Sequence, residues 1–482
     1  MKYDLILRAA HVIDPVNGTD AVLDIGIVAG KVAEMGPSLS GADAKEIIDL
    51  SGYTAIPGVI DTHTHVDGPA HRMMAKAGVC TALDMSEMRG VVRDFPVRAC
   101  GLNIAGLQVI GPWPDADAVP SEAEVAKAID AATADGAIGI KIIGGHLPST
   151  PAATERMIEM ANRAKVYVAF HCGTTEAGSN LKGLLEAVEL AGDNSLHIAH
   201  VNSYLRGTVA DPMDEVRQGL AAIDGKKNLV SESYLAIING TGGSFGPDGL
   251  PHSHVTRINL RMGGYSVDLK GMEAAIADGY GMVQIEEGGE TVLVTGTRGV
   301  AIWKERDTKV GMSFPVNQPQ STFLCAVRKG KGGGFVVDAI STDGGGIPRN
   351  VAVEYGLALV KYRALTMNEF VSKVSTAGAR MLGLKDKGHL GVGADADITV
   401  LDMREGKAAM TIVGGKVVMA HGVVYGTGGT IITTPRGEAK VKAAVEAANA
   451  GAGAGPSGAA AMPFRYQTVH PEEMLIYTKR QG

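Results

Sequence analysis

The feature that most limits how this chain can fold is a regular alternation of short apolar runs with amphipathic stretches. The runs have the length expected of buried strands, and they occupy residues 55–60, 81–85, 106–110, 138–143, 166–170, 195–199, 229–232 and 335–340. Alanine-rich stretches with helical spacing lie between them, and the stretch at 121–134 begins with a capping-box pattern, Ser121 and Glu124. Eight such strands over roughly 300 residues predict a parallel (β/α)₈ TIM barrel, an α/β fold. An open doubly wound sheet is the alternative, but no glycine-rich dinucleotide motif follows the first strand.

The two ends of the chain show a different pattern, with short β-like runs separated by turns. These runs lie at 5–7, 12–14, 24–28 and 31–34, and again at 396–401, 411–418 and 422–425. We therefore predict one small β-sandwich domain built from residues 1–54 and 385–432, beside a barrel of residues 55–384. Residues 433–482 are expected to form a C-terminal helix, a Gly/Ala linker and a tail.

One long span interrupts the alternation between the seventh and eighth predicted strands. It carries further β-like runs at 281–285, 291–294 and 321–325, and its ends are rich in glycine. We interpret residues from about 240 to 334 as an insertion on the face of the barrel where the strands end.

Composition restricts the partners and the cell compartment. The formal net charge of −7 gives no electrostatic basis for binding nucleic acid or an anionic membrane. Four cysteines without paired spacing predict a reducing, cytoplasmic environment, and no apolar run reaches the length of a membrane span. We expect a small-molecule substrate and a homo-oligomer, either a dimer or a tetramer.

Residues able to bind metal or transfer protons follow several predicted strands at the same end. His63 and His65 are one residue apart at the exit of the first strand, so their side chains share a face. Each could be an ordinary hydrogen-bonded residue, but active sites of such barrels form where strands meet their following loops. Six residues of this kind predict a shared metal site: His63, His65, Lys141, His171, His200 and Asp343.

This set resembles the amidohydrolase superfamily, most closely its hydantoinase, dihydropyrimidinase and dihydroorotase branch. Residues 57–65 (PGVIDTHTH) resemble the first metal motif of that superfamily, and residues 391–397 (GVGADAD) resemble its glycine-alanine-aspartate signature. The resemblance implies that a CO₂-derived carbamate on Lys141 bridges two divalent metal ions, zinc first, with Mn²⁺ or Co²⁺ as alternatives. It also implies that His171 and His200 bind the second metal and that Asp343 completes the first site. Asp343 would then accept a proton from the attacking water and deliver it to the leaving nitrogen.

Two positions bear on the substrate. Cyclic-amide hydrolases of this branch often have a tyrosine five residues after the bridging lysine, where this chain has His146, which we expect to stabilise the oxyanion. Arg206 could bind a substrate carboxylate, although a surface arginine is an equal alternative. The predicted function is hydrolysis of a C–N amide bond in a small cyclic amide or ureide. The alternatives are an N-acyl amino acid deacylase or related carbamate or amide hydrolase, and a catalytically silent homologue acting as an assembly subunit.

Overall fold

The computed structural model describes residues 2–111, 113, 118–451 and 461–479, and a barrel lies at its centre. Each barrel strand pairs in parallel with the next along the chain, and β18 (Gly344–Gly345), which follows the last strand closely, pairs with β6 and closes the ring. The strands are β6 (Val59–His65), β7 (Val79–Asp84), β8 (Cys100–Val109), β9 (Gly139–Ile142), β10 (Tyr167–Phe170), β11 (Leu196–Ile198), β12 (Leu229–Tyr234) and β17 (Ala339–Ser341). The predicted (β/α)₈ barrel is therefore confirmed, and the open-sheet alternative is wrong.

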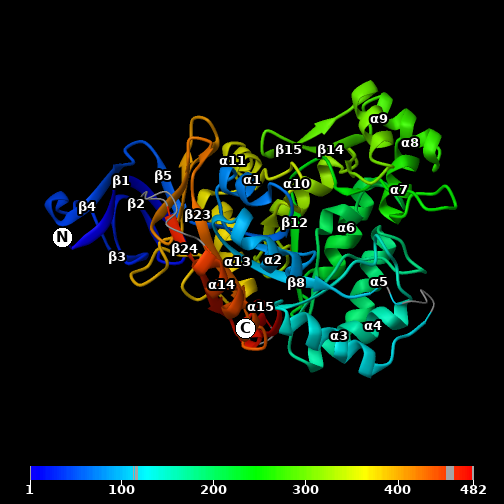
Figure 1. Cartoon of the computed structure of the whole chain (residues 1–482), viewed down its shortest axis with the longest axis horizontal. Helices are drawn as coiled ribbons and strands as arrows, with labels where there is room; N and C mark the ends of the chain where they lie inside the picture. Colours follow the sequence, from blue (N-terminus) through cyan, green and yellow to red (C-terminus); the bar gives the residue numbers. More distant parts are fainter. Residues whose placement is uncertain (1, 112, 114–117, 452–460, 480–482) are drawn as a thin grey trace.

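Helices between these strands form the outer layer (Figure 1). Several begin at side chains that accept backbone N–H groups, and Ser121 with Glu124 forms the predicted capping box. The barrel helices are α1 (Ala70–Lys76), α2 (Met88–Arg98), α3 (Glu122–Ala134), α4 (Pro151–Arg163), α5 (Leu181–Ala191), α6 (Pro212–Ile223), α10 (Pro319–Val327) and α11 (Ala352–Lys361), followed by α12 (Met367–Val371) and α13 (Ala377–Leu382). Their buried faces and the strands share one large apolar core.

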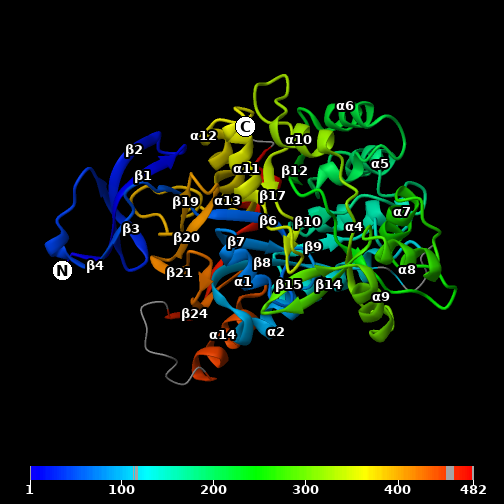
Figure 2. The same cartoon turned by 90° about the horizontal axis from the view of Figure 1, so that it is seen from above.

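The second sheet joins the two ends of the chain, as expected (Figure 2). Its nine strands are β1 (Tyr3–Asp14), β2 (Thr19–Val28), β3 (Lys31–Gly36), β4 (Ala44–Asp49), β5 (Thr54–Pro57), β19 (Ile398–Asp402), β20 (Lys407–Val413), β21 (Lys416–Ala420) and β22 (Val423–Val424). The antiparallel pairing of β5 with β19 links the two halves. These strands form one connected sheet. The predicted run at 55–60 is divided at Gly58, where an added Cβ would lie 2.7 Å from Sγ of Cys80.

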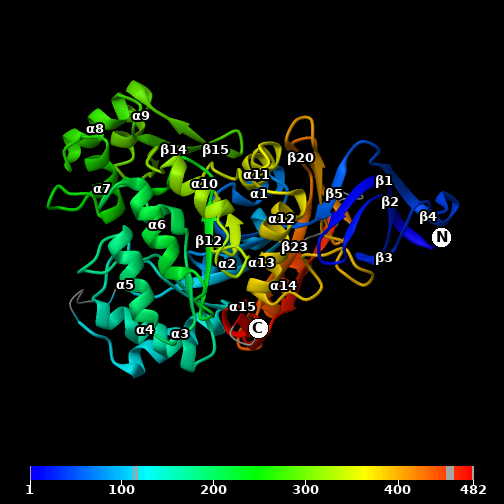
Figure 3. The same ribbon diagram turned by 180° about the vertical axis from the view of Figure 1, so that it is seen from behind.

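The insertion before the last strand has a small sheet of its own (Figure 3). Its buried side chains form a separate apolar core. It contains β13 (Thr241–Gly242), α7 (His254–Met262), α8 (Leu269–Ala277), β14 (Met282–Glu287), β15 (Glu290–Val294), α9 (Gly296–Glu305) and β16 (Gly311–Ser313). The β-like run predicted at 321–325 is wrong, because these residues belong to α10. Pro319 lies in the first turn of α10, and Cys325 and Ala326 are buried on one helical face. A short apolar run does not distinguish a strand from a buried helix.

The C-terminal segment extends the barrel sheet. Strand β23 (Thr427–Thr433) pairs in parallel with β8 and with β24 (Ala461–Thr468), so most of this strand, which the sequence grouped with the small domain, is bonded to the barrel. The predicted helix is α14 (Glu438–Gly451), and α15 (Leu475–Thr478) lies near the C-terminus. Residues 452–455 of the predicted Gly/Ala linker lie outside the described residues. Within the described part of the chain, no helix is long and apolar enough to cross a membrane.

Candidate functional site

A narrow buried pocket lies where the barrel strands end, and it collects every site residue singled out in the sequence. Strand order alone accounts for this gathering, because the carboxyl ends of parallel strands meet at one face. The predicted residues that line the pocket are His63, His65, Lys141, His146, His171, His200, Arg206 and Asp343. Residues at the start of the insertion, including Asn239, Gly240 and Val255, complete the wall.

The carboxylate of Asp343 lies among the histidines. Its Oδ1 atom is 3.0 Å from Nε2 of His65 and 3.2 Å from Nε2 of His63. Potential ligand atoms of His63, His200 and Asp343 lie within 4.8 Å of one another. The ring of His200 stacks on His63 with centroids 5.0 Å apart, and its centroid is 4.3 Å from that of His171. These donors are close enough to share a bound cation.

Burial keeps the imidazoles of His63, His171 and His200 neutral. It lowers the pKa of His63 to about 4, and it lowers the pKa values of His171 and His200 well below their usual range. The Nδ1 atom of His200 is buried and has no hydrogen-bond partner among the described residues. Neutral imidazole is the form that binds metal, and an unpartnered buried ring nitrogen is costly without a ligand.

Two of these residues have uncommon backbone angles. His200 has φ of +33° and Asp343 has φ of +50°, in the region that non-glycine residues seldom adopt. The backbone N–H of His200 donates to Oε1 of Glu232 at 2.6 Å, and that of Asp343 donates to the carbonyl of His63 at 2.9 Å. These bonds hold the two side chains toward the pocket at a cost in backbone strain.

Glu232 in β12 is a site residue that the sequence reasoning missed. It is fully buried, and its Oε1 accepts a hydrogen bond from Nδ1 of His63 at 2.7 Å while its Oε2 accepts one from the hydroxyl of Ser341. Burial opposes its charge, but His63 and His197 outweigh this effect and hold the pKa of Glu232 well below its usual value. The proton on Nδ1 leaves the Nε2 lone pair of His63 facing Asp343. The available signal was a single acidic residue within a predicted barrel strand.

Lys141 is buried in β9, with a pKa that suits reaction as a neutral amine. Burial lowers the pKa of its amine to about 8, although the nearby carboxylates of Glu232 and Asp343 oppose this shift. Among the described residues, Nζ of Lys141 donates a hydrogen bond to Sδ of Met85, at 3.1 Å. A thioether is a weak acceptor, so an ammonium group would be poorly satisfied here.

Arg349 binds the other side of Asp343. Its Nη2 lies 2.7 Å from Oδ2, and its Nε donates to the backbone carbonyl of Asp343 at 2.5 Å. Burial would raise the pKa of the Asp343 carboxyl, but Arg349 and His63 outweigh it and keep that pKa well below its usual range. Arg349 also lies over the ring of Tyr234, with 4.7 Å between its Cζ and the ring centroid. Asp343 therefore stays ionised with its Oδ1 directed to the histidines.

Arg206 and His146 form part of the pocket wall. Arg206 is only 6% exposed, and its Nε donates to Oδ1 of Asn317 at 2.9 Å, so the alternative of a surface arginine is wrong. The ring of His146 meets that of His171 edge to face, with centroids 4.7 Å apart. Burial lowers the pKa of His146 to about 4.

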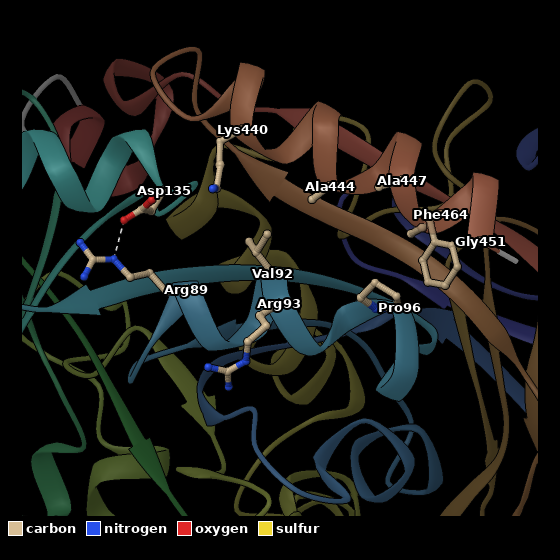
Figure 4. Close-up of a pocket in the computed structure, with 11 residues that line it drawn as sticks. Arg89, Val92, Arg93, Pro96, Asp135, Lys440, Ala444, Ala447, Gly451 and Phe464 are labelled. Atoms are coloured by element: carbon tan, nitrogen blue, oxygen red, sulfur yellow. Dashed lines mark hydrogen bonds and ion pairs between the residues drawn. The ribbon is translucent and has the colours of Figure 1, made fainter.

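A second, wider groove lies between α2, α14 and β24, away from the strand ends (Figure 4). Its floor is apolar, with Val92, Pro96 and Phe464. The lining residues that the structure describes include no histidine and one carboxylate, Asp135, which pairs with Arg89. The described lining residues of this groove therefore include no cluster of metal-binding side chains.

The chain is similar to several known proteins. The model of the amidohydrolase family matches residues 54–418. A dihydroorotase from Geotalea daltonii is 23% identical over 467 residues, which cover 86% of this chain and 99% of that protein. N-acyl-D-glutamate deacylase from Bordetella bronchiseptica, solved with zinc and a phosphonate inhibitor, superposes with a TM-score of 0.60 at 17% identity, over 87% of this chain and 97% of that one. A chain of the formyltransferase/hydrolase complex from Methylorubrum extorquens, solved with methylofuran, has a TM-score of 0.61 at 16% identity and covers 97% of this chain and 100% of its own. The two superpositions show a shared fold.

Proposed function

The chain belongs to the amidohydrolase family, and its relatives include hydrolases that act on carbon–nitrogen bonds; from this we propose that it cleaves an amide bond of a small substrate with two divalent metal ions. The observation that carries the proposal is the single pocket in which all six predicted ligands lie with two arginines. Turnover of a panel of hydantoins, dihydropyrimidines, lactams and N-acyl amino acids by zinc-loaded protein tests it. No turnover of any of these by a fully metallated protein would contradict it.

The side chains fit divalent cations. The imidazoles of His63, His171 and His200 are neutral, the Asp343 carboxylate is ionised, and Nδ1 of His200 lacks a partner in the described structure. Ser179 holds Nε2 of His171 at 3.0 Å, which leaves the other ring nitrogen of His171 for a ligand. We assign His63, His65 and Asp343 to one ion, His171 and His200 to the other, and Lys141 to both, with zinc first and Mn²⁺ or Co²⁺ as alternatives. Such ions, when bound, polarise the amide carbonyl and lower the pKa of a water molecule.

Lys141 would hold the two ions as a carbamate. The neutral amine of Lys141 forms a bond to the carbon of CO₂ and loses one proton, which gives a carbamate anion with two oxygen ligands. The lowered pKa of Lys141 provides the neutral amine near physiological pH. Its poor partner, Met85 Sδ, supports this assignment because an unmodified ammonium would be left without a strong acceptor.

Asp343 is the proposed general base and general acid of the reaction. Its Oδ1 faces the histidines, and Arg349 holds its Oδ2 at 2.7 Å, so the carboxylate is fixed in one orientation. We propose that Asp343 takes a proton from the attacking water and passes it to the leaving nitrogen. Arg349 positions Asp343 for this transfer.

The pocket wall favours an anionic substrate. Arg206 is buried and lines the pocket, and its guanidinium can bind a carboxylate through two hydrogen bonds. We place a cyclic amide or ureide first, since the dihydroorotase match extends over 86% of the chain. An N-acyl amino acid is the second candidate, because His146 occupies the position at which the cyclic-amide enzymes that this chain resembles often have tyrosine.

A role within a larger assembly is a further candidate. The chain of the formyltransferase/hydrolase complex covers 97% of this chain, compared with 87% for the deacylase, so its match extends over more of the sequence. We propose a homo-oligomer of two or four copies in the cytoplasm, consistent with four buried unpaired cysteines. Native mass measurement of the purified protein distinguishes this from a complex with other chains. A silent assembly subunit would bind no zinc.

A further inference from the structure

The insertion is connected to the catalytic pocket through His146. Nδ1 of His146 lies 2.9 Å from the hydroxyl of Ser253, which lies 3.0 Å from the hydroxyl of Thr241. The Thr241 hydroxyl lies 2.7 Å from that of Thr256, which donates to the carbonyl of Gly242 at 2.7 Å. Four groups of the insertion therefore form one chain of hydrogen bonds that ends at the imidazole.

The carbonyl at the far end sets the direction of every bond in this chain. A carbonyl only accepts, so the single proton of Thr256 points to Gly242. The hydroxyl of Thr241 must then donate to Thr256, and the hydroxyl of Ser253 must donate to Thr241. The oxygen of Ser253 is left as the acceptor for His146, which places the ring proton on Nδ1. In the neutral ring, Nε2 then carries a lone pair.

The position of Ser253 supports a dedicated role for this chain. Ser253 is the N-cap residue of α7, where a serine hydroxyl normally accepts a backbone N–H of the first turn. Its side chain makes no capping bond and contacts His146 and Thr241 instead. The backbone N–H of His254 also donates to the carbonyl of His146 at 3.2 Å. The insertion thus holds both the ring and the backbone of His146.

The opposite ring nitrogen is available to a ligand. His146 lines the pocket, and none of the described residues hydrogen-bonds to its Nε2. A neutral ring with its proton on Nδ1 cannot donate from Nε2 to an oxyanion, which was the role expected from the sequence.

We propose that the insertion fixes His146 as a hydrogen-bond acceptor for an N–H group of the substrate, next to the carbonyl that is attacked. This inference rests on the proposed amidohydrolase function and refines its substrate class. The preferred substrates are secondary amides or ureides that carry such an N–H. Their N-methylated analogues leave the Nε2 lone pair without a partner and are rejected.

The tautomer is tested without any turnover. In protein labelled with ¹⁵N-histidine, His146 is assigned by its loss in His146→Gln, and two-bond correlations distinguish a protonated from an unprotonated ring nitrogen. We expect Nδ1 protonated and Nε2 unprotonated. In Thr241→Val, the hydroxyl of Ser253 loses its acceptor and can donate to Nδ1 of His146, so the ring proton of His146 should move to Nε2. Thr291→Val, in strand β15 of the insertion, is the matched control and should leave the ring proton on Nδ1. A proton on Nε2 in the wild type, or no change in Thr241→Val, overturns the inference. So does an Nε2 signal that shifts when zinc is added, because His146 would then be a metal ligand.

A second experiment compares turnover of two compounds: the amide from the panel that is hydrolysed fastest, and its N-methylated analogue. We expect wild-type protein to prefer the N–H compound in kcat/KM by roughly tenfold or more, the usual effect of leaving one buried polar group unpaired. His146→Ala should lose most of this preference, mainly through KM for the N–H compound. Equal rates for the two compounds in the wild type overturn the inference. If no amide is turned over, the proposed function is wrong and so is the substrate class inferred from it. The tautomer of His146 is decided separately, by the NMR experiment.

Discussion

Glu232→Gln is the substitution that most directly tests how the metal site is held. Glu232 is not among the residues that line the pocket, but its carboxylate accepts hydrogen bonds from Nδ1 of His63 at 2.7 Å and from the backbone N–H of His200 at 2.6 Å. It also accepts a hydrogen bond from Ser341. Glutamine keeps the shape of the side chain, removes the charge and turns one acceptor atom into a donor.

The expected effect follows from these contacts. Hydrogen bonds to a charged group contribute about 1.5–3 kcal/mol each, and neutral ones contribute roughly half of that. Glutamine weakens two such bonds and loses the third, so we expect a loss of stability on the order of 3–6 kcal/mol. Because the pKa of Glu232 is held below its usual value, this contribution is present above a pH of about 4.3 and is lost only as the pH falls further. Loss of a carboxylate that orients a ligand histidine typically weakens metal binding by roughly 10- to 100-fold.

Zinc affinity is measured by competition with a chelator at pH 7, and stability by urea unfolding of the metal-free protein. Glu215→Gln is the matched control, since Glu215 is also fully buried and accepts three backbone N–H groups, from Gly207, Val209 and Ala210. Its loss should reduce stability without changing zinc affinity. If Glu232→Gln binds zinc as tightly as the wild type, the carboxylate does not orient His63, and the reasoning is refuted.

Four further outcomes follow from the same geometry. Lys141→Ala should lose zinc and activity, measured by metal analysis and turnover, with partial rescue by a small carboxylic acid; full activity with normal metal content would exclude the carbamate. Asp343→Asn keeps the shape but removes the proton carrier, and should lower kcat by roughly a hundred- to ten-thousandfold; near wild-type turnover would make Asp343 a turn residue only. Arg206→Lys should raise KM about tenfold for a carboxylate-bearing substrate and leave its uncharged analogue unaffected, because the paired hydrogen bonds are lost; equal changes for both compounds would contradict that role. The free energy of unfolding of the metal-free protein should fall as the pH drops from about 6.5 to about 4, because His63 binds a proton in the unfolded chain but not when it is buried. In urea titrations, His63→Gln should reduce this fall by on the order of 3 kcal/mol. An unchanged pH dependence would show that His63 is not neutral in the fold.

Features that depend on local periodicity and on the order of elements along the chain could be predicted from the sequence. Alternating strands and helices indicated the closed barrel, and residues at successive strand ends had to meet at one face. His63 and His65 share a face because side chains alternate along a strand, and Lys141 stood out as a lone charge inside an apolar strand. These relations require no knowledge of which distant atoms touch.

Contacts between residues far apart in the chain could not be predicted in this way and are seen in the folded structure. Glu232 bonds to His63 across 169 positions, and Ser253 bonds to His146 across 107, and no local pattern encodes either pairing. Packing likewise made the run at 321–325 a helix and buried Arg206 in the pocket wall. The physical reason is that strand and helix periods report which face of an element is apolar, whereas the partner of a polar group depends on how whole elements are placed together.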